Sequence, residues 1–313
     1  MAETPETYPL RDIDYVTEKL GWMREQEIWP NGLRYLWTDA FGLVNYVSLY
    51  EETGEETWLN TGEELVEEVD RVLGRERGYR IGEAPDRDGQ YYHYLAMWLY
   101  ALYELGRYRK GYRQKGVQIA RDIHSAFVIP GRGVIWKMLE DLSGPYPGYG
   151  LGAMDAYDGY VPYRLLSPDM LAKEIDEMRD LIEMTYRDLT ITQDLGAGMM
   201  LWLSSIFPEE DWAKTQSARC LQILDEMWID KGWFCREPGY EQVRFAFTNY
   251  GISLGLQAQG KWPQRVAKLN AYFESYRSGD EYDTDAITHV MACTSRLPNA
   301  FLAHRPQGRL EAG

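Results

Sequence analysis

The chain is poor in cysteine and has no long apolar run. Its three cysteines, Cys220, Cys235 and Cys293, are an odd number with wide spacing among 313 residues. This pattern fits free thiols in a reducing cytoplasm and gives no metal-site signature, and no HxxxH pair occurs either. No uncharged apolar run approaches 18 residues, so no transmembrane span is expected. No basic-then-apolar leader opens the sequence, so no signal peptide is expected.

Positive charge is also scarce, and this narrows the possible partners. The chain has 33 Lys and Arg against 49 Asp and Glu, a formal net charge of −16. A net acidic surface repels phosphate backbones, so neither nucleic acid nor an anionic membrane is an expected partner. Part of the charge belongs to solvated helix faces such as "TGEELVEEVDR". The expectation that remains is a cytoplasmic protein with a small-molecule substrate and no cofactor or metal.

Large aromatic side chains are abundant instead. The chain holds 24 tyrosines and 11 tryptophans, many of them near Gly, Asp and Asn rather than within apolar runs. One interpretation is that they are core residues between helices. The other is a pocket lined with amphipathic rings, which suit flat-faced ligands such as sugars. The sequence alone leaves both interpretations open.

Two kinds of helical segment alternate along the chain. In "TGEELVEEVDRVL" apolar residues recur on one helix face with acids on the other, and "SPDMLAKEIDEMRDLIEMTY" repeats this design, with Ser167 as the expected cap and Pro168 as the first helical residue. Segments such as "DAFGLVNYVSLY" and "YYHYLAMWLYALYEL" are apolar on most faces and contain small residues. These segments are expected to be buried on all sides.

The alternation predicts the architecture. Six segments of each kind follow one another, and no strand pattern is convincing. The connections from amphipathic to buried segments are long at 74–90, 128–152 and 229–244, whereas the reverse connections are short. We therefore predict an all-α fold, an (α/α)6 toroid of six inner and six outer helices. It is expected to form one domain over residues 1–305, with a disordered tail at 306–313. An irregular helical bundle is the alternative.

In such a toroid the long loops share one rim, at the N-termini of the inner helices. The stretch "DRDGQYYHYL" is then a rim loop that enters an inner helix, so its polar residues are expected to face a central cleft. The positive ends of the inner helix dipoles would stabilise carboxylates gathered there.

The chain resembles the six-hairpin glycosidase superfamily. The segments "LWTDAFGLVNY", "DGQYYHYL", "WKMLEDLS", "DAYDGYV" and "DAITHVMACTSRLPNAFL" carry the likeness and span nearly the whole chain. The superfamily includes toroidal glycoside hydrolases, unsaturated-glucuronyl hydrolases and, more distantly, N-acylglucosamine 2-epimerases. The nearest likeness is to a largely bacterial branch, from which no catalytic residue is carried over. The resemblance therefore implies the fold, and function has to be argued from the site.

Carboxylates on the predicted rim are the candidate catalytic residues. Asp155 and Asp158 are three residues apart and share a helix face, while Asp88 comes from the neighbouring hairpin. Glycoside hydrolysis needs one carboxyl group to protonate the leaving oxygen and another to activate water or attack carbon. Crowding would raise one pKa of such a pair. We predict that Asp88 pairs with Asp155 or Asp158, and His93 is a further catalytic candidate.

Other polar and aromatic side chains of the rim are candidates for substrate binding. They are Arg34, Trp37, Asp39, Tyr91, Trp136, Tyr240, Arg244, Asn249, Asp285 and His289. Each also has a structural explanation, since Asp is favoured at helix N-termini, arginines pair with carboxylates, and buried histidines are commonly hydrogen-bonded. Their convergence on one rim favours a site. Asp39, Asp88, His93, Asp155 and His289 are accordingly expected to project into one cavity.

The leading hypothesis is a carbohydrate-active enzyme that acts on a small saccharide or glycoside by carboxylate acid–base catalysis. A sugar epimerase or isomerase could use His93 and His289 as acid and base. The stretch "EYDTDAITH" loosely resembles the acidic motif of class II terpene cyclases, which would need a closed aromatic cavity. A non-catalytic ligand-binding toroid would need no close pair of acids. These alternatives stay open on the sequence.

Overall fold

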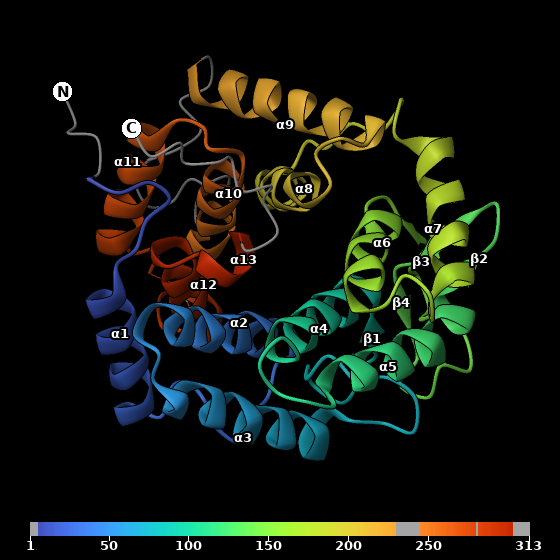
Figure 1. Ribbon diagram of the computed structural model, residues 1–313, viewed down its shortest axis with the longest axis horizontal. Helices are drawn as coiled ribbons and strands as arrows, with labels where there is room; N and C mark the ends of the chain where they lie inside the picture. Colours follow the sequence, from blue (N-terminus) through green and yellow to red (C-terminus); the bar gives the residue numbers. More distant parts are fainter. Residues whose placement is uncertain (1–5, 230–244, 280, 303–313) are drawn as a thin grey trace.

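The computed structural model describes residues 6–229, 245–279 and 281–302. Within these ranges the chain forms two concentric layers of helices (Figure 1). The inner helices are α2 (Leu36–Thr53), α4 (Tyr92–Leu105), α6 (Asp155–Leu166), α8 (Asp194–Ile206), α10 (Ala246–Gln259) and α12 (Ala286–Arg296). The outer helices are α1 (Ile13–Glu25), α3 (Glu56–Leu73), α5 (Tyr112–Phe127), α7 (Ala172–Thr185), α9 (Asp211–Ile229) and α11 (Pro263–Ser275).

The inner helices form a closed ring. Each packs against the next along the chain, and α12 returns to α2, while every outer helix covers an inner neighbour. The all-α (α/α)6 prediction is confirmed. A short helix, α13 (Asn299–Leu302), follows α12 and packs on α2.

Burial follows the two segment types. In α3 the buried residues Leu59, Leu65, Val66, Val69 and Leu73 form one stripe, whereas nearly every residue of α2 and α4 is buried. Small residues bring the inner helices together. A Cβ atom on Gly255 of α10 would stand only 2.2 Å from the carbonyl oxygen of Gly198 in α8, so this crossing requires glycine.

Short strands, which the sequence did not reveal, fix the rim loops. β1 (Gln90–Tyr91) pairs with β4 (Lys137–Met138), and β3 (Gly133–Ile135) lies between β2 (Val128–Ile129) and β5 (Leu151–Gly152); both sheets are antiparallel. Their length of two or three residues is too short to show alternation. They hold the loops before α4 and α6 in place. A 3-10 turn, η2 (Glu281–Asp283), precedes α12.

One predicted helix start is wrong. Ser167 ends α6 rather than capping the next helix, and α7 begins only at Ala172, after a turn in which the Ser167 hydroxyl accepts from the Met170 amide. The expected tail at 306–313, Cys235 and the candidates Tyr240 and Arg244 lie outside the described residues. Cys220 and Cys293 are free and buried.

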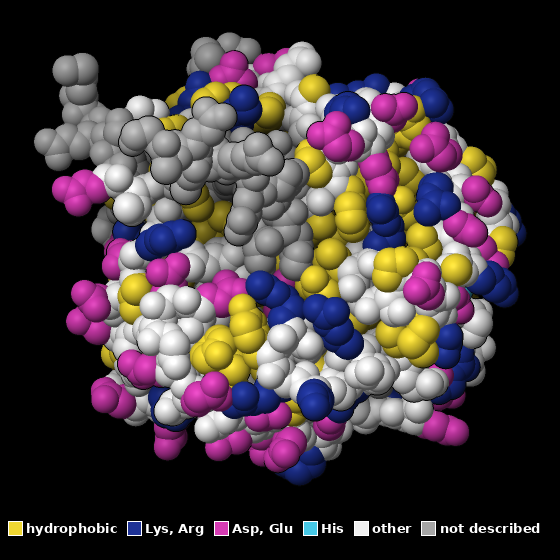
Figure 2. Space-filling view, viewed as in Figure 1, with side chains coloured by type: hydrophobic (Ala, Val, Ile, Leu, Met, Phe, Trp, Pro, Cys, Tyr) yellow, Lys and Arg dark blue, Asp and Glu magenta, His cyan; other side chains and the backbone are white. Residues whose placement is uncertain are grey.

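Acidic and basic side chains are interspersed around the edge of the face seen in Figure 2, where outer helices lie. This mixture is that of solvated helix faces. Among the described residues, no helix is both long and apolar enough to cross a membrane.

Candidate functional site

Two adjoining cavities open at the N-termini of the inner helices. The larger, here the central cavity, has a volume of about 830 Å³ and is lined from within residues 28–38, 82–87, 93–94 and 281–287, with Leu195 and Phe247. The smaller, here the side cavity, has a volume of about 430 Å³ and is lined from within residues 151–158 and 189–199, with Trp136. Trp37, His93 and Leu195 line both, so the two cavities meet at these side chains.

The N-terminus of α6 brings two carboxyl groups to the side cavity. Asp155 and Asp158 stand in the first turn of the helix, and both line the cavity. Asp155 is only 4% exposed, and its Oδ1 has no hydrogen-bond partner among the described residues. Burial, reinforced by the negative charge of Asp155, raises the pKa of Asp158 well above its ordinary value. The arrangement therefore places an acid with a raised pKa beside a buried carboxyl group.

Gly152 makes room for Asp155. A Cβ atom at Gly152 in β5 would lie 1.6 Å from Asp155 Oδ2, a distance that no side chain could tolerate. The carboxyl group thus sits directly against the backbone of the strand that precedes its helix. The short sheet of β2, β3 and β5 consequently fixes the place of Asp155.

His93 joins the acidic pair from α4. Its Nδ1 accepts a hydrogen bond from Trp136 Nε1 at 3.2 Å and lies 3.7 Å from Asp155 Oδ1. Its ring also packs against Trp37, Tyr91 and Tyr94. His93 and Asp155 therefore lie close together, although they originate from different hairpins.

Tryptophan side chains stand at the junction and mouth of the cavities. Trp37 is buried, lines both cavities and has an indole N–H with no acceptor within the described ranges. Trp136 lines the side cavity and is 41% exposed. Rings of this kind can stack on a sugar.

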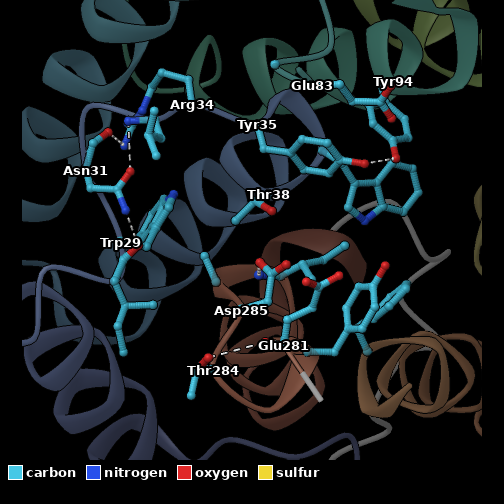
Figure 3. Close-up of a pocket in the computed structure, with 18 of the residues that line it drawn as sticks. Trp29, Asn31, Arg34, Tyr35, Thr38, Glu83, Tyr94, Glu281, Thr284 and Asp285 are labelled. Carbon is cyan, nitrogen blue, oxygen red and sulfur yellow. Dashed lines mark hydrogen bonds between the residues drawn. The ribbon is translucent and has the colours of Figure 1, made fainter. Parts of the chain in front are cut away.

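The central cavity is acidic and aromatic. Figure 3 shows Glu281 and Asp285, from the segment entering α12, across the cavity from Tyr35 and Tyr94, whose hydroxyl groups are 2.5 Å apart. Asp285 also caps α12 by accepting from the Ile287 amide at 3.2 Å, and burial raises its pKa. Asp285 therefore caps a helix and also lines the central cavity, the two roles that the sequence left open for it.

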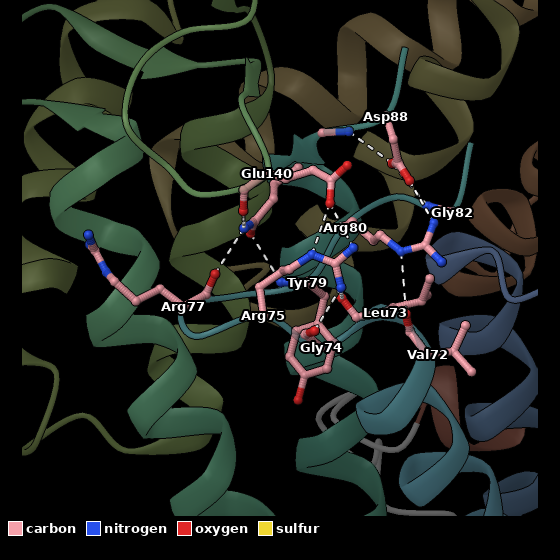
Figure 4. A network of polar contacts seen from close by, with 12 residues as sticks. Val72, Leu73, Gly74, Arg75, Arg77, Tyr79, Arg80, Gly82, Asp88 and Glu140 are labelled. Carbon is pink, nitrogen blue, oxygen red and sulfur yellow. Dashed lines mark hydrogen bonds and ion pairs between the residues drawn. The ribbon is translucent and has the colours of Figure 1, made fainter. Parts of the chain in front are cut away.

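Asp88 does not join the acidic pair. Its Oδ2 accepts from Arg80 at 2.7 Å, its Oδ1 accepts from the amides of Gly82 and Gly89, and it lines neither cavity (Figure 4). The predicted pairing of Asp88 with Asp155 or Asp158 is therefore not found. The carboxylate is instead held within its own loop, because a charge buried this deeply needs partners.

Asp39 and Arg34 pair with one another. Asp39 accepts from Trp29 Nε1 at 2.8 Å and lies 3.5 Å from Arg34 Nη1, and Asn31 O accepts from the same arginine. Burial raises the pKa of Asp39 to about 6, although Arg34 and Trp29 oppose the shift. Arg34 lines the central cavity, whereas Asp39 lies behind it. Asp39 thus does not project into the expected cavity.

His289 faces away from the site. It lines a small separate cavity with Lys19 and Glu274, and its ring packs edge-on against Trp22 of α1, with centroids 4.9 Å apart. Burial lowers its pKa to about 4, so the ring is neutral. His93 and His289 are therefore not brought together.

Two further candidates are placed outside the cavities. Asn249 is fully buried in α10 and donates to the Phe245 carbonyl. Tyr91 belongs to β1 and stacks on Trp136 with ring centroids 5.8 Å apart, so it supports a lining residue without lining either cavity itself.

Sequence reasoning missed several lining residues. Glu83, Thr38, Tyr94 and Glu281 line the central cavity but were not singled out as site residues. Glu83 lies in the long 74–90 loop and Glu281 in "EYDTDAITH", so loop length and the acidic motif were the available signals. Across the part of the chain that the structure describes, no group of three or more His, Cys, Asp and Glu side chains is suited to a metal ion.

Comparisons with known proteins place the fold. No known sequence family matches the chain, and no curated protein is similar to it by sequence. Among solved structures, a sugar epimerase from a ruminal bacterium is similar with a TM-score of 0.62 at 12% identity, over 91% of this chain and 98% of its own. A GH76 alpha-mannanase of Bacteroides thetaiotaomicron is similar with a TM-score of 0.65 at 11% identity, over 94% and 97%.

A cellobiose 2-epimerase from Spirochaeta thermophila is also similar, with a TM-score of 0.61 at 13% identity, over 87% of this chain and 88% of its own. At such low identities the likeness shows the fold alone. The likeness supports the (α/α)6 toroid, the fold that the resemblance in the sequence implied.

Proposed function

We propose that the protein is a carbohydrate-active enzyme that acts on a small saccharide or glycoside by carboxylate acid–base catalysis. The observation that carries the proposal is the pair at the N-terminus of α6, where the pKa of Asp158 is raised and Asp155 is buried with no hydrogen-bond partner for its Oδ1 among the described residues. Perturbed carboxyl groups in a cleft are typical of catalytic sites. The fold shared with mannanases and sugar epimerases supports the same substrate class.

The two carboxyl groups take different roles in hydrolysis. Asp158 donates its proton to the glycosidic oxygen as the bond between this oxygen and the anomeric carbon breaks. Asp155 accepts a proton from the water whose oxygen bonds to the anomeric carbon, and the products are a free sugar and the protonated leaving group, which is a second sugar or an alcohol. The Oδ1 of Asp155 is a buried acceptor that has no hydrogen-bond partner among the described residues.

The cavities supply binding surfaces on both sides of this pair. Trp37, which lines both cavities, and Trp136 provide ring faces for a sugar. The central cavity adds hydroxyl, amide and carboxyl groups, including those of Asn31, Glu281 and Asp285. A polar, aromatic-walled recess of this kind fits a polyhydroxylated ligand that extends from the side cavity.

Epimerisation by two histidines has less support. His93 is the one histidine of the described ranges that lines either cavity, since His289 faces α1 and His124 pairs with Glu177. An epimerase on this scaffold would have to combine His93 with a carboxyl group such as Asp155. The open, acid-lined cavity also disfavours a terpene cyclase, and the close acidic pair disfavours a purely binding role.

The test is a substrate screen with matched variants. Aryl glycosides and disaccharides are assayed for new reducing ends, and free sugars in deuterated water are assayed for exchange of the proton beside the carbonyl group. Hydrolysis that falls at least about 100-fold in Asp158→Asn and Asp155→Asn supports the proposal. The control is Asp180→Asn, an exposed carboxylate on the outer helix α7.

Two outcomes would contradict this assignment. Equal hydrolysis by the wild type and both α6 variants would remove the acidic pair from the mechanism. Proton exchange without hydrolysis, abolished in His93→Asn, would instead favour the epimerase.

A further inference from the structure

Two groups compete for one nitrogen of His93. Trp136 Nε1–H donates to Nδ1 at 3.2 Å, and Asp155 Oδ1 lies 3.7 Å from the same atom without a hydrogen-bond partner of its own in the described structure. An indole N–H can only donate, and a carboxylate can only accept. Nδ1 cannot serve both groups in the same protonation state.

The contact with Trp136 determines the tautomer of the neutral ring. A neutral imidazole has one N–H and one lone pair, so a nitrogen that accepts from Trp136 must carry the lone pair. The proton then resides on Nε2. Without the indole N–H, the buried carboxyl of Asp155 would draw the proton to Nδ1, because a buried acceptor without a partner is costly.

Trp136 is held in place although 41% of it is exposed. Its backbone carbonyl accepts from the Tyr92 amide at 3.1 Å, and its amide donates to the Gly150 carbonyl at 3.0 Å. Its ring packs against Tyr91 and Tyr149, with centroids 5.8 and 5.3 Å away.

The supporting tyrosines are themselves anchored on a buried cation. Lys137, only 1% exposed, places its ammonium 4.7 Å from the Tyr91 ring, 5.1 Å from the Tyr149 ring and 4.2 Å from the Tyr146 ring. The ammonium also donates to the Arg87 carbonyl at 2.6 Å. The backbone hydrogen bonds of Trp136 and the packing of its ring therefore position the indole N–H, although the side chain is partly exposed.

We propose that Trp136 is a positioning residue that holds His93 in its Nε2–H tautomer and thereby keeps His93 from hydrogen-bonding to Asp155. This contact leaves Asp155 Oδ1 without a hydrogen bond from His93 and makes Nε2 of His93 a hydrogen-bond donor. Its catalytic meaning rests on the proposed function, in which Asp155 is the proton acceptor. The tautomer itself is a property of the resting protein.

The experiment is nitrogen NMR of the full-length protein labelled with ¹⁵N-histidine, without substrate and at about pH 9, where ordinary histidines are neutral. Chemical shifts and couplings to the ring protons distinguish the two tautomers, and His93→Asn assigns the signals. The wild type is expected to show Nε2–H, and Trp136→Phe, which keeps an aromatic ring but removes the donor, is expected to show Nδ1–H as the main form.

The matched control is Trp22→Phe. Trp22 packs edge-on against His289 and is remote from His93, so its replacement is expected to leave the His93 signals unchanged. A double variant of Trp136→Phe and Asp155→Ala tests the competition itself. Without the carboxylate, the swing to Nδ1–H seen in Trp136→Phe is expected to be lost.

The proposed role of Trp136 is overturned if His93 is already Nδ1–H in the wild type, or if Trp136→Phe leaves the tautomer of His93 unchanged. This result does not depend on turnover. If instead the tautomer changes as expected while the Asp155→Asn and Asp158→Asn proteins hydrolyse the substrate normally, the positioning role of Trp136 holds and the proposed function fails.

Discussion

The loop at 74–90 and the N-terminus of α6 both bring buried carboxyl groups to the same rim, but they treat them in opposite ways. In the loop, Asp88 accepts hydrogen bonds from Arg80 and from two backbone amides (Figure 4). The neighbouring Gln90 accepts from one backbone amide and donates to two backbone carbonyl groups. At α6, Asp155 keeps an oxygen without a partner in the described structure, and the pKa of Asp158 is raised.

The difference separates structural from functional acids. A carboxylate whose two oxygens both accept hydrogen bonds stabilises the chain around it and has little acceptor capacity left for a ligand. A buried carboxylate oxygen without a partner costs stability. Asp39 shows that position also matters, since it too has an unpartnered oxygen but lines no cavity.

The largest expected effect concerns the α6 pair. Asp155→Asn should lower turnover by about 10²- to 10⁴-fold, because the proton acceptor is lost. The free energy of unfolding should stay the same or rise, since a buried charge without a partner disappears. Turnover on the hydrolysed substrate and urea denaturation measure the two quantities. A destabilised but active Asp155→Asn protein would place Asp155 with Asp88 among the structural acids.

The next effect is a pH dependence caused by Asp39. Its pKa is raised to about 6 in the fold, so the folded protein binds more protons than the unfolded chain between pH 4 and pH 6. Stability is therefore full below the unfolded pKa and falls as pH rises through the folded pKa, by about 3 kcal/mol in total. Urea denaturation of the wild type and Asp39→Asn across this range measures the difference. Parallel curves for the two proteins would refute the shift.

A smaller loss of stability is expected from Asp88→Ala. Removing the carboxylate leaves Arg80 and two amides without their acceptor, which should cost about 2 kcal/mol. Arg80→Ala serves as the matched partner, and the double variant should lose less than the sum of the two. Turnover per folded molecule should remain near that of the wild type. A loss of turnover without a loss of stability would return Asp88 to the catalytic candidates.

The smallest effect tests the support of Asp155. Gly152→Ala places a methyl group against Asp155 Oδ2, so the carboxyl group has to move. Turnover should fall about 10-fold, because misplacing a catalytic group by about 1 Å costs up to about 10²-fold in rate. Gly150→Ala is the control, since a Cβ atom there meets nothing within 4 Å. Equal turnover of the two variants would show that the place of Asp155 is not critical.

The fold could be predicted from the sequence because helix periodicity is a local property. Alternating amphipathic and buried segments, together with asymmetric loop lengths, were sufficient for the toroid. The spacing of Asp155 and Asp158 likewise placed both on one helix face. The strands of the rim were not predicted because, at two or three residues, they are too short to show the alternation of a β-strand.

The rest of the site depends on partners that are distant in space or on the direction of a helix face. No local sequence pattern showed that Arg80 would form an ion pair with Asp88. None showed that His289 would pack against Trp22 of α1 rather than line the cleft. Conversely, His93 and Asp155 meet only because the second and third hairpins of the ring are neighbours. These relations follow from packing of the ring, which a single sequence does not encode in any short stretch.

The most direct test of the acidic pair is a carbon NMR titration of the Asp158 carboxyl group in the resting protein, with Asp158→Asn to assign the signal. The midpoint is expected well above the ordinary aspartate value of about 4, since burial disfavours the charged form. It should move down in Asp155→Asn, because the second cause of the shift is the charge of Asp155. A midpoint near 4 that is unaffected by Asp155→Asn would contradict a protonated acid at α6.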